Sequence, residues 1–172
     1  MNEKKFKPIR PADADPIFNT VGNDWMLLTA SDGERTNTMT VSWGCFGKLW
    51  NKNVAICYVR PQRYTYEILE KTEHLTLSVL PEEYREILQM CGTVSGRDGD
   101  KLEKAGLTCA LAKNGAPYPE QSRLVFACKK LYADDIREEC MIDPKLALQF
   151  YPQKDFHRFY VCEIEQVLVE KK

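Results

Sequence analysis

The chain has 172 residues, which suits one domain with a full hydrophobic core. Lys and Arg number 24 against 25 Asp and Glu, and the net charge of -1 argues against nucleic-acid binding, which needs a broad basic surface. No apolar run approaches the roughly 20 residues that span a bilayer, so we expect no membrane segment.

The N-terminal region lacks the pattern of a signal peptide. Its first residues are basic, but prolines and charges follow over residues 8–16, where a signal peptide carries an apolar core. We therefore expect a cytoplasmic protein with an N-terminal arm over residues 1–20 and a single domain over residues 21–172. Seven cysteines, none within four residues of another, indicate reduced thiols and not a zinc site or a redox pair.

Short runs rich in β-branched and apolar residues predict strands. These strands cover residues 25–30, 38–43, 54–59, 75–80, 123–132 and 157–169. The first two flank the turn signal of residues 31–34 and are expected to pair. This spacing favours a mainly β fold with helices, and a barrel over a βαβ sheet.

Helices are predicted to interrupt the strands irregularly. They cover residues 64–71, 81–92, 95–106 and 143–149, the last being a single short turn. Pro81 opens the second helix in the preferred position, and Gly92 supplies its stop. Ser95 followed by Asp98 fits the capping pattern of the third helix.

Several familiar kinds of site have no counterpart in the sequence. There is no glycine-rich dinucleotide or NTP-binding loop, and no Gly-x-Ser-x-Gly elbow of a serine hydrolase. With only His74 and His157 and no Cys/His cluster, a metal site has too few ligands close together. We therefore expect no bound metal.

Two segments gather cations and hydroxyls at loop-to-helix junctions. One is Arg-Pro-Gln-Arg-Tyr-Thr over residues 60–65, and the other is Cys-Gly-Thr-Val-Ser-Gly-Arg-Asp-Gly-Asp-Lys over residues 91–101. Guanidinium groups, hydroxyls and the first turn of a helix all donate hydrogen bonds to anions. The segments predict a site for the phosphate of a cofactor, although Arg60 and Arg63 also fit two solvated charges on a turn.

The strand over residues 37–43 is suited to a flat heterocycle beside this phosphate site. Asn37, Met39, Val41 and Trp43 share one face, whereas Thr38, Thr40 and Ser42 share the other. One face is expected to contact a ring and the other a polar tail. Trp43 is equally consistent with a core residue.

The combination of motifs is more specific than any one of them. Asn-Thr-Met-Thr-x-Ser-Trp from residue 37, the segments 60–65 and 91–101, and a strand at 157–163 with a histidine six positions before a glutamate follow in this order. Together, over residues 25–167, they resemble the flavoredoxin-like branch of the flavin reductase family. The resemblance implies FMN in a split β-barrel with short peripheral helices, and a homodimer with FMN at or near the subunit interface.

The resemblance also implies roles for individual residues. Asn37 and Trp43 would lie by the flavin or its ribityl chain, and His157 would reach the ring system as a possible catalytic residue, although a partly exposed structural histidine is the alternative. Arg60, Arg63, Thr65 and Lys101 would serve the phosphate or ribityl oxygens, with Ser95 nearby. The full set of expected cofactor-binding residues is Asn37, Thr38, Met39, Thr40, Ser42, Trp43, Arg60, Arg63, Tyr64, Thr65, Ser95, Lys101 and His157.

Three functions remain open from the sequence. The first is an FMN-dependent oxidoreductase that takes hydride from NADH or NADPH and passes electrons to an acceptor such as another protein. The second is a non-enzymatic, flavoredoxin-type electron carrier that a protein partner reduces. The third is a small-barrel interaction protein without a cofactor.

Many members of the family that the chain resembles continue past the last strand with an aromatic tail. We expect the region that this tail covers in them to be open here or covered by residues 6–17.

Overall fold

The computed structural model describes residues 10–170, so residues 1–9 of the predicted N-terminal arm lie outside the described residues. The rest of that arm is helical. It contains the 3-10 turn η1 (Pro11–Asp13), the single turn α1 (Ile17–Asn19) and the start of the π-helix η2 (Thr20–Asp24). No helix within residues 10–170 is long and apolar enough to cross a membrane.

The body of the protein is an antiparallel sheet of seven strands in the order β2-β1-β5-β8-β9-β4-β3. These strands are β1 (Met26–Ser31), β2 (Thr36–Val41), β3 (Gly44–Leu49), β4 (Lys52–Val59), β5 (His74–Val79), β8 (Leu124–Asp135) and β9 (Arg158–Val169). A separate pair is formed by β6 (Cys109–Leu111) and β7 (Pro117–Pro119). The predicted mainly β fold is confirmed.

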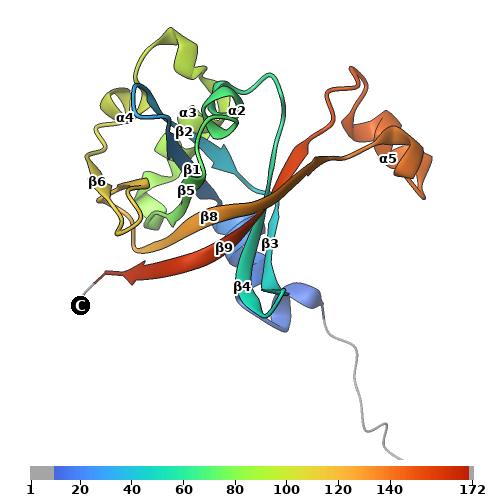
Figure 1. Ribbon diagram of the computed structural model, residues 1–172, viewed down its shortest axis with the longest axis horizontal. Coiled ribbons are helices and arrows are strands. Elements are labelled where there is room, and N and C mark those ends of the chain that lie inside the picture. Colours follow the sequence, from blue (N-terminus) through green and yellow to red (C-terminus); the bar gives the residue numbers. More distant parts are fainter. Residues whose placement is uncertain (1–9, 171–172) are drawn as a thin grey trace, which may run out of the picture.

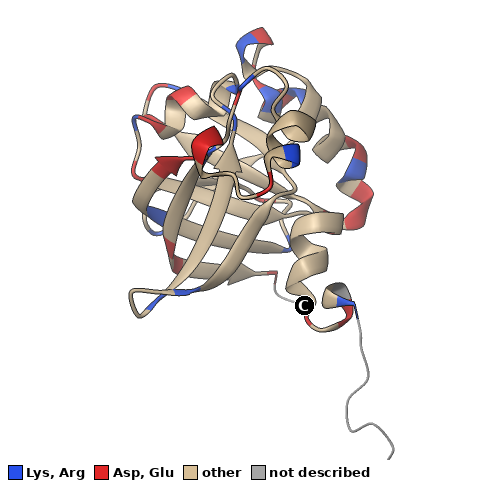
Figure 2. Ribbon diagram, turned by 90° about the vertical axis from the view of Figure 1, so that its right-hand side faces the viewer, with Lys and Arg blue, Asp and Glu red and all other residues tan. Residues whose placement is uncertain are grey.

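Short helices gather at two places around the sheet. Figure 1 shows α2 (Tyr64–Leu69), α3 (Arg85–Thr93) and α4 (Lys101–Lys104) together on one side, and α5 (Pro144–Phe150) well away from them, beyond the ends of β8 and β9. Single 3-10 turns are η3 (Glu82–Tyr84), η4 (Gly96–Asp98) and η5 (Glu138–Cys140). Figure 2 shows the strands from the side as a curved wall, with basic and acidic residues interspersed around it.

The interior of the sheet is filled by alternate side chains of its strands. Met26, Leu28 and Ala30 of β1 meet Tyr160 and Cys162 of β9 in one cluster, and each of these side chains is at most 1% exposed. All seven cysteines are free, and those of β4, β8 and β9 are buried. The burial of alternate strand residues is the main apolar contribution to stability.

A second apolar cluster covers the outer face of β1. Leu27 points away from the interior and packs with Leu88 and Cys91 of α3 and with Leu102 of α4. Both faces of β1 are covered, so residues 26–30 are buried without a break and do not alternate between buried and exposed. The Thr40 hydroxyl of β2 also donates to the carbonyl of Leu88, which fixes α3 against the sheet.

Several element predictions need correction. The predicted third helix is two elements, since Gly99 adopts a φ of 125° between η4 and α4. Asp100 caps α4 by accepting hydrogen bonds from the backbone N–H groups of Leu102 (2.8 Å) and Glu103 (3.2 Å). The Ser95 hydroxyl accepts from the Arg97 N–H (3.2 Å) and belongs to η4.

The segment after β2 also differs from the prediction. β2 ends at Val41, and β3 begins at Gly44 and pairs with β4, so Ser42 and Trp43 lie in the link between two strands. β3 escapes the sequence pattern because its small and polar residues are largely exposed. The predicted short turn after Asp143 is the seven-residue helix α5.

Gly96 allows the loop before α4 to approach β2 and α2 closely. A Cβ atom at this position would lie 2.3 Å from the Asn37 Oδ1 atom and 2.6 Å from the Tyr64 Cδ1 atom. Asn37 cannot yield easily, because it is buried and its Nδ2 donates to the Thr65 hydroxyl at 2.8 Å.

We predict that Gly96→Ala lowers the free energy of unfolding by about 1–3 kcal/mol, because the added methyl group clashes with fixed side chains. Gly47→Ala is the matched control, since a Cβ there meets no atom within 4 Å. Urea unfolding of both variants measures the effect. Equal stability of the two variants would show that the loop does not depend on this close approach.

Candidate functional site

A pocket of about 260 Å³ opens where the ends of β2, β4 and α3 meet the start of β9. Its lining combines cations, aromatic rings and small polar side chains. The lining residues are Met39, Thr40, Val41, Ser42, Trp43, Tyr58, Arg60, Arg63, Gly92 and His157. The pocket therefore brings together the segment 37–43, the segment 60–65, the start of the segment 91–101 and His157.

Arg63 and Lys101 meet at the C-terminal end of α3. Arg63, at the N-cap of α2, donates from Nη1 to the Gly92 carbonyl (2.7 Å) and from Nη2 to the Cys91 carbonyl (3.3 Å). The Lys101 Nζ donates to the same Cys91 carbonyl at 2.9 Å. Two cations from separate helices thus share one backbone oxygen behind the pocket.

The electrostatic environment of this pair is positive. Within residues 10–170, neither cation has a carboxylate among its hydrogen-bond or charge partners. The C-terminal end of a helix offers only about half an elementary negative charge against the two positive charges. Burial, and then the neighbouring Arg63, lowers the pKa of Lys101 to about 8. An anion in the pocket would balance the remaining charge.

Arg60 is arranged differently from Arg63. Its Nη1 forms a close ion pair with Asp155, and its Nη2 donates to the Phe150 carbonyl at 2.9 Å. The guanidinium carbon also lies 5.2 Å from the centre of the Tyr151 ring. Arg60 therefore fastens the segment between α5 and β9 to the rim of the pocket.

Aromatic rings form the opposite side of the pocket. The Trp43 ring centre lies 5.1 Å from that of His157 and 5.5 Å from that of Phe150. Trp43 is 43% exposed, which excludes a role as an ordinary core residue. His157 is 9% exposed, and burial, followed by the nearby Arg60, lowers its pKa to about 4. At neutral pH its imidazole is uncharged.

Comparison with known proteins identifies the family of the chain. Residues 18–172 match the family described as Flavin reductase like domain. The chain belongs to the flavin reductase like family. Comparison with curated proteins gave no match.

Solved structures share the fold of this flavin reductase like chain. An FMN-binding protein from Thermus thermophilus with bound p-hydroxybenzaldehyde is 18% identical, with a TM-score of 0.69 over 99% of this chain and 83% of that one. The flavoredoxin of Desulfovibrio vulgaris is 20% identical, with a TM-score of 0.68 over 98% and 78%. A protein with a split barrel domain from Shewanella frigidimarina is 19% identical, with a TM-score of 0.69 over 95% and 76%. The expected split barrel is confirmed.

Some of the predicted cofactor-binding residues lie outside the pocket lining of the flavin reductase like domain. Asn37 bonds to Thr65, and both side chains are buried. The Thr38 hydroxyl lies 3.0 Å from that of Thr29 across the β1–β2 pair and is fully buried. These contacts hold β2 and the start of α2 together behind the pocket wall.

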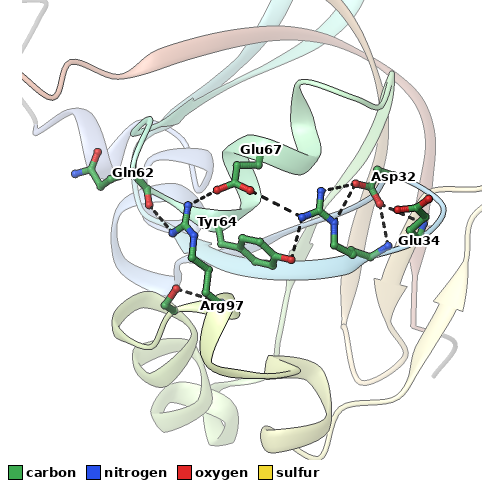
Figure 3. Close-up of polar contacts among 8 residues, drawn as sticks. Asp32, Glu34, Gln62, Tyr64, Glu67 and Arg97 are labelled. Carbon is green, nitrogen blue, oxygen red and sulfur yellow. Dashed lines mark hydrogen bonds and ion pairs between the residues drawn. The ribbon is translucent and has the colours of Figure 1, made fainter.

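Tyr64 and Ser95 lie in a polar network on the outer side of α2. In Figure 3, Tyr64 lies between two ion pairs, one of Arg97 with Glu67 and the other at Asp32. The Tyr64 hydroxyl accepts from Arg35 Nη1 at 3.2 Å, and the guanidinium carbons of Arg35 and Arg97 lie 5.5 and 5.3 Å from its ring centre. Arg97 also pairs closely with Glu67. The network joins the two loops that carry the cations.

Sequence reasoning missed three residues of the site. Tyr58 lines the pocket and lies two positions before Arg60, so strand alternation would have found it. Tyr151 and Asp155 come from a distant segment of the chain, since Asp155 follows its partner Arg60 by 95 residues. No local pattern marks them.

We predict that His157 makes the domain less stable in acid. Its pKa is about 4 in the folded protein against an ordinary 6.5, so the unfolded chain binds more protons and stability falls as the pH drops from 6.5 to 4. His157→Gln should remove about 2 kcal/mol of this loss, less than the full shift implies because the pocket is open to solvent. Urea unfolding at several pH values measures it. His74→Gln, at a partly exposed strand end, is the control, and identical slopes in both variants would contradict the assignment.

Proposed function

We propose that this chain is an FMN-dependent oxidoreductase that accepts hydride from NADH or NADPH and passes electrons to an acceptor. The carrying observation is the pair of Arg63 and Lys101, a partly buried and a buried cation without a carboxylate partner in the described chain, beside a pocket walled by Trp43 and His157. The family match supports a flavin, and the fold shared with an FMN-binding protein supports FMN.

The phosphate of FMN fits the chemistry of the cationic side. Charge-assisted hydrogen bonds contribute roughly 1.5–3 kcal/mol each, and micromolar binding requires about 8 kcal/mol in all. Arg63 and Lys101 would hold the phosphate, with Arg60 at the rim. Thr65, in the first turn of α2, and Ser95, before η4, would support the loops that carry them.

The flavin ring fits the aromatic side of the pocket. Trp43 and Tyr58 supply apolar surface, and Met39, Thr40 and Ser42 line the adjoining wall from β2 and its end. When bound, FMN supplies the hydride-accepting chemistry, and the protein orients and tunes it. Asn37, Thr38 and Tyr64 would act on the cofactor through the placement of β2 and α2.

A flavoredoxin-type electron carrier is the second candidate. The specific observation that favours it is the fold likeness to a flavoredoxin at a TM-score of 0.68 over 98% of this chain. A carrier would use the same cofactor contacts and would receive its electrons from a protein partner. Only the ability to oxidise a nicotinamide separates the two candidates.

We also propose a cytoplasmic homodimer. Ile142 and Leu148, in α5 and just before it, are fully or largely exposed, and exposed apolar side chains gathered in one place are typical of surfaces that a partner covers. The exposed side of the pocket would then be completed by a second copy of the chain.

We predict that Arg63→Met and Lys101→Met each weaken FMN binding by tenfold or more, because each removes a charge-assisted contact to the phosphate. Riboflavin, which lacks the phosphate, should bind all variants within threefold of the wild type. Fluorescence titration with both flavins measures this. Lys129→Met, outside the pocket lining, is the control for loss of a cation. An equal loss for FMN and riboflavin would contradict a phosphate role.

The same experiment has a pH dependence. Since the pKa of Lys101 is about 8, its ammonium group is charged at pH 7 and largely neutral at pH 9. We therefore predict that FMN affinity falls across this range in the wild type and much less in Lys101→Met. A parallel decline in both proteins would assign the effect to another group.

We predict that the purified protein with FMN oxidises NADH or NADPH with turnover on the order of 1 s⁻¹ or faster, as is typical of enzymes. Absorbance of the nicotinamide measures the rate, with free FMN alone as the background. Turnover at the background level with both donors, in a protein that retains FMN, would favour the carrier.

A further inference from the structure

Tyr151 and His157 form a buried polar pair at the pocket. The Tyr151 hydroxyl lies 2.8 Å from the His157 Nδ1 atom, and the two residues are 6% and 9% exposed. His157 lines the pocket, whereas Tyr151 stands behind it, between the end of α5 and the start of β9. The hydroxyl of Tyr151 therefore reaches the pocket through the imidazole, whereas its ring also contacts the guanidinium of Arg60.

We propose that Tyr151 is a positioning residue that donates its hydroxyl proton to Nδ1 and so holds His157 as the neutral tautomer with its proton on Nε2. The ring then presents an uncharged N–H donor to the ligand in the pocket. This inference rests on the proposed flavin function for the identity of that ligand. The tautomer itself does not depend on it.

The direction of the hydrogen bond follows from the protonation states. A neutral imidazole has one donor and one acceptor nitrogen, and the hydroxyl of a tyrosine is a stronger acid than the imidazole N–H. Burial raises the pKa of Tyr151, so its hydroxyl keeps the proton that it donates. Arg60 disfavours and Asp155 favours the charged imidazole, and the low pKa of His157 shows that burial and Arg60 prevail.

The position of the Tyr151 ring is fixed from several directions. It stacks on Phe156 with 4.5 Å between ring centres and 29° between ring planes. The Arg60 guanidinium lies 5.2 Å from its centre, and Arg60 is itself held by Asp155. The Tyr151 backbone N–H donates to the Ala147 carbonyl at 2.9 Å. These contacts therefore hold the Tyr151 hydroxyl in place beside the Nδ1 atom of His157.

The remaining polar atom of the imidazole is Nε2. No hydrogen bond among the side chains of residues 10–170 engages it, while Trp43 packs beside the ring at 5.1 Å between centres. A fixed, neutral donor stabilises an acceptor atom whose negative charge increases during a reaction, and it needs no reorganisation to do so. Donation from Nε2 to the bound flavin is the role that Tyr151 secures.

The tautomer can be measured directly by ¹⁵N NMR of the flavin-free protein. The chain has only two histidines, so His74→Gln assigns the signals of His157. We expect an unprotonated Nδ1 and a protonated Nε2 at neutral pH. A protonated Nδ1 in the wild type would overturn the proposal.

Tyr151→Phe tests the consequence, because it removes the hydroxyl and keeps the ring that stacks on Phe156. We expect mixed tautomers of His157, roughly tenfold slower flavin reduction, as for the loss of one hydrogen bond, and FMN affinity within threefold of the wild type. Tyr132→Phe is the matched control, since it removes an exposed hydroxyl bonded to Asp134.

The outcomes separate this inference from the proposed function. An unchanged tautomer and unchanged reduction rate in Tyr151→Phe would overturn the role of Tyr151, even with FMN bound. A wild-type protein that binds no FMN would overturn the flavin function and the donation to it, whichever tautomer the flavin-free protein shows. A tenfold loss of FMN affinity in Tyr151→Phe with an unchanged tautomer would assign Tyr151 to binding and refute its positioning role.

Discussion

The site depends on the carbonyl of Cys91, which receives hydrogen bonds from both Arg63 and Lys101. Two like charges repel each other, and burial removes much of the water that would screen them. The end of α3 offsets part of this cost with its unpaired carbonyls and the negative end of its dipole. Any movement of α3 would therefore change the position of both cations.

The packing around α3 explains why this carbonyl stays in place. Leu88 and Cys91 pack on Leu27 of β1, and the Thr40 hydroxyl bonds to the Leu88 carbonyl, so the helix is fixed to β1 and β2 together. On the other side, the network around Tyr64 joins the start of α2 to the loop before α4 (Figure 3). Apolar burial supplies stability here, and the polar contacts set the alignment of the three helices.

The sequence predicted the site to different degrees in different regions. Segments 60–65 and 91–101 were recognisable because cations, hydroxyls and glycine lie close together along the chain, and the structure brings Arg63 and Gly92 to one pocket. The roles of Tyr151 and Asp155 could not be predicted, because their contacts form only when β8 and β9 pair and bring the segment after α5 next to β4. β3 was missed because a strand exposed on its outer side needs no apolar alternation.

The local sequence did not reveal which partners the polar side chains of the pocket wall have. The sequence predicted Asn37 and Thr65 as cofactor ligands on a polar strand and helix, but their side chains bond to each other within the pocket wall.

Arg60 combines two roles at the rim of the pocket. A guanidinium has more N–H donors than Asp155 and the Phe150 carbonyl engage. One side chain can therefore anchor the segment after α5 and still offer N–H donors to an arriving anion, so that holding the rim and recognising charge need not compete.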